Sequence, residues 1–173
     1  PGEAGGEALY NVIFGKVNPS GKLAETYPIK EEDNIVSKYF PMGPKNVEYR
    51  ESIYVGYRYF DSANKNVLFP FGYGLSYTTF EYSDLKIDGM EVSYNVTNTG
   101  KADGYEVCQL YISDPNPTVF KAKKELKGFD KVFIKAGETV AVKHTLDYRS
   151  FAFYNTVIDD WYAPNGDYNV LIG

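Results

Sequence analysis

The stretch that decides the fold is Phe69-Pro-Phe-Gly-Tyr-Gly-Leu-Ser-Tyr-Thr-Thr-Phe80. Pro70 fixes its own backbone angle φ and favours an extended residue before it, so no helix crosses this point. Gly72 and Gly74 flank Tyr73, which is typical of a turn that brings the backbone close to another surface. The last four residues favour β-structure and begin the first strand of the sequence that follows.

The same stretch is rich in large apolar side chains: Phe69, Phe71, Tyr73, Leu75, Tyr77 and Phe80. A flexible tether would be polar and would not need this much apolar area. We therefore expect a packed hinge over residues 69–78 that holds two units together.

From residue 79 onward the sequence predicts a β-sandwich of about seven short strands. Met90, Val92, Tyr94 and Val96 alternate with polar residues, as in a strand with one buried face. The apolar run Tyr105–Ile112 predicts a central strand covered on both faces. The other expected strands, with no helix among them, are Lys131–Ile134, Thr139–Leu146, Ser150–Tyr154 and Tyr168–Ile172.

Before the hinge the signals are mixed. Residues Pro1–Phe14 predict a short helix that ends at Gly15, and Lys22–Pro28 predicts a short strand. Residues 29–48 contain Pro41, Gly43 and Pro44 and predict a long loop, and Tyr54–Phe60 predicts another strand. Because these elements are too few for an independent domain, we expect the chain to begin within a larger one.

Composition excludes several classes of function. The chain has 173 residues, 18 basic and 23 acidic, with a net charge of −5, which argues against nucleic-acid binding. No apolar stretch is long enough to span a membrane. No signal peptide is visible either, but this says nothing about compartment, because the chain is expected to begin within a domain. Cys108 is the only cysteine, so no internal disulfide forms, and the missing cysteine pair favours a fibronectin III-like sandwich over an immunoglobulin domain.

The hinge resembles the junction found in the family 3 glycoside hydrolases, the β-glucosidases and β-xylosidases. Three other stretches resemble that family in the same order: Gly15-Lys-Val-Asn-Pro-Ser-Gly-Lys-Leu23, Tyr54-Val-Gly-Tyr-Arg-Tyr-Phe60 and Lys124-Glu-Leu-Lys-Gly-Phe129. The resemblance implies that residues 1–68 are the C-terminal piece of an α/β sandwich domain. It also implies that residues 79–173 are a fibronectin type III-like β-sandwich.

The resemblance implies no catalytic residue in this chain. Retaining glycosidases use two carboxyl groups about 5–5.5 Å apart, and the family supplies them from segments outside the part that matches here. Glu51 is the best remaining acidic candidate, and a structural carboxylate that bonds to nearby backbone or to Arg58 is the favoured interpretation over a catalytic one. The family usually has Glu-Gly where this chain has Glu51-Ser52.

Other candidates favour ordinary structural roles. His144 is the only histidine, so a metal site is not expected. We expect His144 to be packed in the sandwich or to lie on an edge strand. Cys108 is expected to be a buried thiol, and Asp159-Asp160 a solvated loop pair. The sequon Asn95-Val-Thr97 matters only in a secreted eukaryotic protein. Five aromatic residues could form a sugar-stacking platform, although packing in the sandwich core and its corners is the favoured interpretation: Tyr111, Tyr148, Tyr154, Tyr162 and Trp161.

Two hypotheses follow. In the first, the chain is the non-catalytic C-terminal portion of a β-glycosidase, inactive alone, that supports the α/β and barrel domains of an enzyme acting on terminal β-linked glucose or xylose. In the second, the sandwich is a module that binds carbohydrate or protein. The apolar hinge favours the first hypothesis, because an independent binding module is expected to be joined by a polar linker. Neither hypothesis needs a cofactor or a metal.

Overall fold

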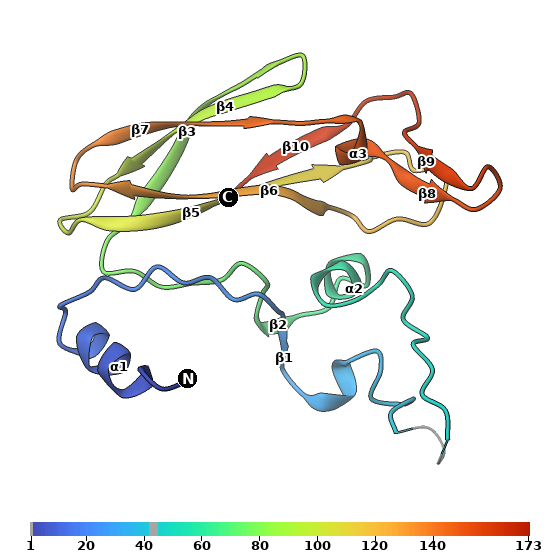
Figure 1. Cartoon of the computed structure of the whole chain (residues 1–173), viewed down its shortest axis with the longest axis horizontal. Helices are drawn as coiled ribbons and strands as arrows, with labels where there is room; N and C mark the ends of the chain where they lie inside the picture. Colours follow the sequence, from blue (N-terminus) through green and yellow to red (C-terminus); the bar gives the residue numbers. More distant parts are fainter. Residues whose placement is uncertain (1, 42–44) are drawn as a thin grey trace.

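The computed structural model describes residues 2–41 and 45–173. Two three-stranded antiparallel sheets lie face to face, and the part of the chain before residue 79 runs along the outer side of one of them (Figure 1). The first sheet has the order β3-β4-β7, with β3 Phe80–Asp88, β4 Glu91–Asn98 and β7 Thr139–Thr145. The second has the order β10-β5-β6, with β5 Gly104–Ser113, β6 Glu125–Ile134 and β10 Asn169–Ile172.

The core lies between these sheets. Nine buried side chains form it: Val92, Tyr94, Val96, Cys108, Leu110, Ile112, Ile134, Val142 and Leu146. The predicted alternation in β4 is confirmed from Val92 to Val96, whereas Met90 lies in the turn before the strand and is half exposed. The mainly β, fibronectin III-like fold class predicted from the sequence is confirmed, with the helical and extended elements of the partial α/β segment before it.

Strand β5 is central and is covered on both faces, as its apolar run predicts. Cys108, Leu110 and Ile112 point into the core. Gln109 lies on the opposite face and is also buried, because the hinge covers it. The two faces of β5 therefore serve different purposes: one builds the sandwich core and the other receives the first part of the chain.

The chain before the hinge contains four short elements and one 3₁₀ turn. Helix α1 spans Gly5–Ile13, β1 spans Tyr27–Pro28, the 3₁₀ turn spans Glu31–Asp33, α2 spans Tyr57–Ser62 and β2 spans Val67–Phe69. Strands β1 and β2 pair with each other in an antiparallel two-stranded sheet. The predicted helix, its stop at Gly15 (φ 67°) and the end of the first strand at Pro28 are confirmed, although β1 is shorter than expected.

The strand predicted at Tyr54–Phe60 is wrong, because Tyr57–Ser62 forms helix α2. Gly56 (φ 54°, ψ −132°) takes a backbone conformation that suits glycine and turns the chain into the helix. A helix places residues three apart on the same face, so Tyr57 and Phe60 can both turn inward. Aromatic residues favour strands only weakly, and packing decides the outcome.

The strand predicted at Ser150–Tyr154 is only partly correct. The prediction that no helix follows the hinge is wrong. Tyr148–Phe151 forms the short helix α3, and Asp147 caps it by accepting hydrogen bonds from the backbone and the hydroxyl of Ser150, both at 2.8 Å. Strand β8 follows at Phe153–Asn155 and pairs with β9 at Asp160–Tyr162. The hydrogen bonds from Ser150 lower the pKa of the Asp147 carboxyl below its ordinary value.

The long loop predicted over residues 29–48 is confirmed where the structure describes it, apart from the 3₁₀ turn at Glu31–Asp33. Pro1 and residues 42–44, including Gly43 and Pro44, lie outside the described residues. Within the described ranges, no helix is long and apolar enough to cross a membrane.

Burial differs sharply between the two parts. Among described residues before Thr78, Phe60 is the only buried side chain, and α1 has none. Large apolar side chains on this part are instead exposed, among them Leu9, Ile13, Phe14, Val17 and Leu68. The sandwich has a core of its own, whereas residues 2–77 have almost none.

Candidate functional site

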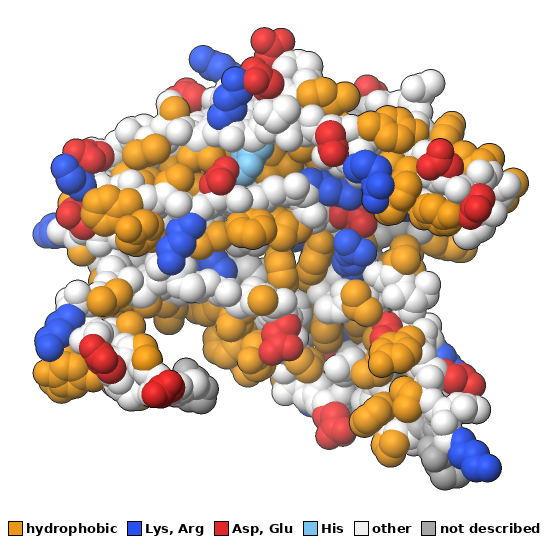
Figure 2. All heavy atoms as spheres, viewed as in Figure 1, with side chains coloured by type: hydrophobic (Ala, Val, Ile, Leu, Met, Phe, Trp, Pro, Cys, Tyr) orange, Lys and Arg blue, Asp and Glu red, His pale blue; other side chains and the backbone are white. Residues whose placement is uncertain are grey.

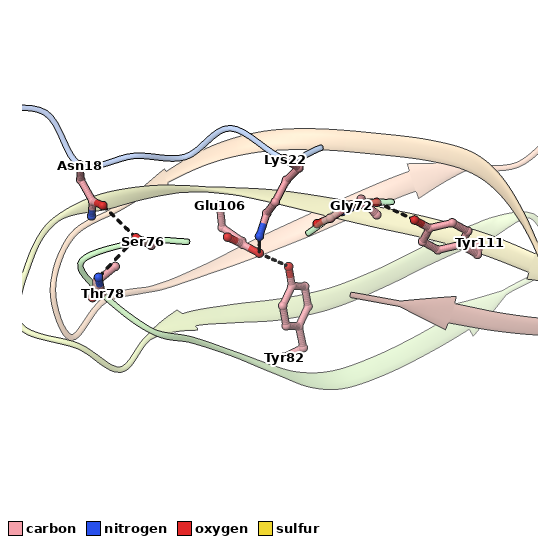
Figure 3. Close-up of polar contacts among 9 residues, drawn as sticks. Asn18, Lys22, Gly72, Ser76, Thr78, Tyr82, Glu106 and Tyr111 are labelled. Carbon is pink, nitrogen blue, oxygen red and sulfur yellow. Dashed lines mark hydrogen bonds and ion pairs between the residues drawn. The ribbon is translucent and has the colours of Figure 1, made fainter. Parts of the chain in front are cut away.

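The site that the structure builds is an interface, with the chain before residue 79 on one side and the sandwich on the other. Asn18 lies at its left end in Figure 3. Its Oδ1 accepts hydrogen bonds from the Ser76 hydroxyl and from the backbone N–H of Tyr77, both at 2.9 Å. Its Nδ2 donates to the carbonyl oxygen of Asp103 at 3.0 Å. One side chain therefore connects the turn after α1, the hinge and the loop before β5.

A partly buried ion pair lies beside Asn18. Lys22 Nζ donates to Glu106 Oε1 at 3.0 Å, and the Tyr82 hydroxyl donates to the same oxygen at 3.0 Å (Figure 3). Glu106 comes from β5, Tyr82 from β3 and Lys22 from the chain before β1, so this carboxylate joins both sheets to the first part of the chain. Burial raises the pKa of Tyr82 above its ordinary value, and the neighbouring Glu106 adds to the shift, so the hydroxyl remains a donor.

The middle of the interface is aromatic. The rings of Tyr57 and Phe71 lie 4.8 Å apart, and Tyr111 on β5 meets the Tyr57 ring edge-on at 6.0 Å. The Tyr57 hydroxyl accepts a hydrogen bond from the backbone N–H of Leu126 at 2.9 Å. Burial, followed by the charges of Tyr57 and Asp61, raises the pKa of Tyr111 to about 12. Tyr111 therefore packs beneath the hinge and does not lie on an open sugar-binding face. This agrees with the predicted packing role.

Two glycines allow the backbone of the hinge to approach its neighbours. A Cβ on Gly72 (φ 81°) would lie 2.4 Å from Gln109 Oε1, and one on Gly74 would lie 2.5 Å from the carbonyl oxygen of Gly21. Gln109 Nε2 donates to the carbonyl oxygen of Gly72 at 3.3 Å. The close approach predicted from the glycine pattern is confirmed.

The far end of the interface is held by ion pairs. Arg58 Nη2 lies 3.3 Å from Glu125 Oε1, and Lys124 Nζ lies 3.2 Å from Asp61 Oδ2. Both pairs join α2 to the start of β6 or the residue before it. Together, these contacts fix the first part of the chain against the sandwich.

Glu51 does not have its expected partner. Arg58 pairs with Glu125, and Glu51 Oε2 is buried without a hydrogen bond to any described residue. The expected bond to Arg58 or nearby backbone is therefore wrong within the described chain. Ser52 adopts a positive φ of 52°, a backbone conformation that favours the glycine expected here from the resemblance. Among described residues, no group of three His, Cys, Asp or Glu side chains could hold a metal.

His144 and Cys108 are both buried in the sandwich, as predicted. The Tyr94 hydroxyl and His144 Nε2 are hydrogen-bonded at 2.9 Å, and Asp130 Oδ2 lies 3.4 Å from His144 Nδ1. A Cβ on Gly128 would come within 3.2 Å of the same ring, so glycine makes room for it. Burial raises the pKa of Cys108, which keeps it a thiol.

The remaining aromatic candidates are not in the core. Tyr148, Tyr154 and Tyr162 are about half exposed and surround the β8–β9 hairpin together with Trp161. Figure 2 shows hydrophobic side chains gathered over this end of the molecule. The core interpretation is wrong for Tyr148, Tyr154 and Tyr162, because the hairpin pairs two strands of three residues each and joins neither sheet of the sandwich. Trp161 is partly buried. Asp159 and Asp160 are exposed, as predicted, and Asp159 accepts a hydrogen bond from Tyr154. Asn95 of the sequon lies within β4.

Sequence reasoning missed the residues that make the interface: Asn18, Lys22, Tyr57, Glu106 and Gln109. Asn18 was interpretable only as part of a turn. A usable signal was the presence of Glu106 and Gln109 inside the apolar run of β5, because a polar residue in a strand buried on both faces needs a partner.

Comparison with known proteins agrees with this organisation. The family model described as "Glycosyl hydrolase family 3 C-terminal domain" matches residues 1–77, and the model described as "Fibronectin type III-like domain" matches residues 106–173. Thermostable beta-glucosidase B of Acetivibrio thermocellus is 51% identical over 180 residues, which cover 99% of this chain and 24% of that protein. An exo-alpha-(1->6)-L-arabinopyranosidase of Bifidobacterium breve is 42% identical, covering 99% of this chain and 23% of that protein.

Solved structures show the same likeness. A GH3 beta-glucosidase of Bifidobacterium adolescentis superposes with a TM-score of 0.93 at 43% identity, covering 98% of this chain and 26% of that one. The chain thus spans about a quarter of the length of these relatives. It belongs to glycoside hydrolase family 3, with residues that match the family's C-terminal domain followed by residues that match a fibronectin type III-like domain.

Proposed function

We propose that this chain is the non-catalytic C-terminal portion of a β-glycosidase and that it supports the catalytic domains of the parent enzyme. In this proposal residues 1–68 close the α/β sandwich domain, residues 69–78 are the packed hinge and residues 79–173 are the supporting sandwich. One observation carries the proposal: a part with a single buried side chain is fixed by Asn18, Lys22 and Tyr57 to a sandwich with its own core.

The exposed apolar side chains of α1 and its surroundings support the same conclusion. An isolated helix of nine residues is not stable in water, and a contiguous apolar surface usually marks a contact with another unit. The missing α/β and barrel domains of the parent would cover it. The sandwich would then hold the last elements of the α/β domain in place from the other side.

The parent's substrate in this proposal is a terminal β-linked glucose or xylose. The relative named thermostable beta-glucosidase B supports glucose, whereas another relative is named as an exo-alpha-(1->6)-L-arabinopyranosidase, so the names of the relatives differ in the sugar. The alternative, an independent module that binds carbohydrate or protein, is less well supported, because the hinge is fixed by hydrogen bonds on both sides.

Two measurements test the proposal. The chain alone should hydrolyse no aryl β-glucoside or β-xyloside, and turnover that is lost in Glu51→Gln would contradict this. In the full-length parent, Glu106→Ala should lower the melting temperature and kcat together, because it leaves Lys22 and Tyr82 without their partner. Glu138→Ala is the matched control, since Glu138 is exposed in a surface pair with Lys135. Equal effects of the two variants would refute the supporting role.

A further inference from the structure

A cleft of about 600 Å³ lies between the start of α2 and the β8–β9 hairpin. Its walls come from three separate parts of the chain: Ile53 and Arg58, residues 119–127 leading into β6, and residues 152–161 around the hairpin. The volume is within the range of small-molecule sites, and such sites occur preferentially where two domains meet. The interface described above does not use this cleft, apart from Arg58 and Glu125 on its edge.

The apolar part of the lining presents exposed rings. Phe120 is 91% exposed, and Tyr154 is half exposed. Trp161 lies against Tyr154 at 5.8 Å edge-on, and the Arg149 guanidinium lies 3.4 Å from the centre of the indole ring. Arg149 therefore fixes the indole from one side. The indole held in this way offers apolar surface at low conformational cost.

The polar part of the lining includes three side chains linked by ion pairs, together with Lys121, which pairs with Asp114 at 3.8 Å. Glu125 Oε1 lies 3.3 Å from Arg58, and Glu125 Oε2 lies 3.3 Å from Lys127 Nζ. All three side chains are largely covered, so their geometry is constrained. The guanidinium and the ammonium retain free N–H donors, and the carboxylate oxygens retain acceptor capacity. These side chains offer several donors and acceptors in fixed positions, and with Lys121 counted together with its partner Asp114 their charges sum to +1.

We infer that this cleft binds a short neutral saccharide. A sugar ring has two C–H-bearing faces that pack on aromatic rings and an edge of hydroxyls that both donate and accept hydrogen bonds. The cleft combines these two kinds of surface, with rings at one side and the Arg58–Glu125–Lys127 chain at the other. The inference rests on the proposed function only in taking β-linked glucose or xylose units as the sugars to test.

Trp161 is the only tryptophan in the chain, so its fluorescence reports on the cleft directly. The 173-residue chain is titrated with cellotriose and with xylotriose while indole emission is followed. We expect a saturable change with at least one of the two. Phe120→Ala should weaken the affinity about three- to tenfold, the range expected for one aromatic contact. Phe133→Ala is the matched control, because Phe133 is about half exposed beside Tyr105, outside the cleft, and should leave the affinity unchanged.

A missing domain of the parent is the competing occupant of the cleft. To distinguish it, Phe120→Cys is made in the full-length parent and in the 173-residue chain, and the rate of maleimide labelling is compared; Cys108 is buried and should react little. Equal rates are expected. Protection in the parent, or no saturable response to either sugar, would overturn the inference. Neither result bears on the supporting role, which is tested by Glu106→Ala. Glu106 lies opposite Val132 near the end of β6, whereas the cleft lies at the start of β6.

Discussion

Replacing Phe71 by alanine tests whether the hinge is a packed contact. The Phe71 ring lies 4.8 Å from that of Tyr57, and its backbone N–H donates to Thr26 Oγ1 at 3.2 Å. The substitution removes the ring and keeps the backbone bond. It therefore isolates the aromatic contribution to the interface.

The expected magnitude follows from how much of the ring is covered. Truncating a fully buried Phe costs about 3–5 kcal/mol. Phe71 is only partly buried, so we expect a loss of about 2 kcal/mol in the free energy of unfolding. For a chain of this size that loss lowers the melting temperature by about 4–8 °C.

Thermal unfolding followed by circular dichroism measures the effect, and small-angle scattering measures whether the two parts move apart. Leu75→Ala is the control, because Leu75 belongs to the same hinge but is 70% exposed. It should change stability by less than about 0.5 kcal/mol. If the two variants melt alike and scatter like the unmodified chain, the hinge is a linker and our reasoning is wrong.

Three further predictions concern single positions. Ser52→Gly should raise stability by about 1 kcal/mol, because φ is 52° there; Asn64→Gly, at φ 50°, should change little because Asn tolerates this conformation. Asn98→Ala should cost about 2–4 kcal/mol in urea unfolding, since the buried amide donates to the carbonyls of Ala102 and Ile134, whereas Asn95→Ala should not. Burial raises the pKa of Tyr111 to about 12 from an ordinary 10, so its contribution to stability is present below pH 10 and is lost as the pH rises from 10 to 12. Stability measured against pH should therefore fall less over this range in Tyr111→Phe than in the unmodified chain, while the other buried tyrosines keep part of the loss.

The sandwich could be predicted from the sequence because its signals are local. Alternation in β4 and the apolar run of β5 each reflect the environment of a single strand. The helix at Tyr57–Ser62 could not, since its aromatic residues suit either structure and the deciding contact, from Tyr57 to Leu126, joins residues 69 apart. The same holds for Asn18 and Asp103, 85 residues apart. Such partners are determined by tertiary packing, which one sequence does not reveal.

The aromatic residues of the hairpin illustrate a different failure. Large rings are well buried on average, and on that ground Trp161 and its neighbours are expected in the sandwich core and its corners. The hairpin is too short to share in either sheet, so the rings remain at the surface. Composition identifies which residues are able to pack, whereas topology decides whether anything is present to pack on them.

The bonds of Asn18 have a consequence for how the two parts of the chain can separate. Its amide connects Ser76, Tyr77 and Asp103 at the same time. Only the bond to Asp103 joins the first part of the chain to the sandwich, whereas the bonds to Ser76 and Tyr77 lie within the first part. A rotation of the first part relative to the sandwich therefore breaks the Asp103 bond and can leave the other two intact. When this end opens, we expect the Tyr77 amide to remain protected from exchange with solvent hydrogen, because Asn18 moves together with the hinge.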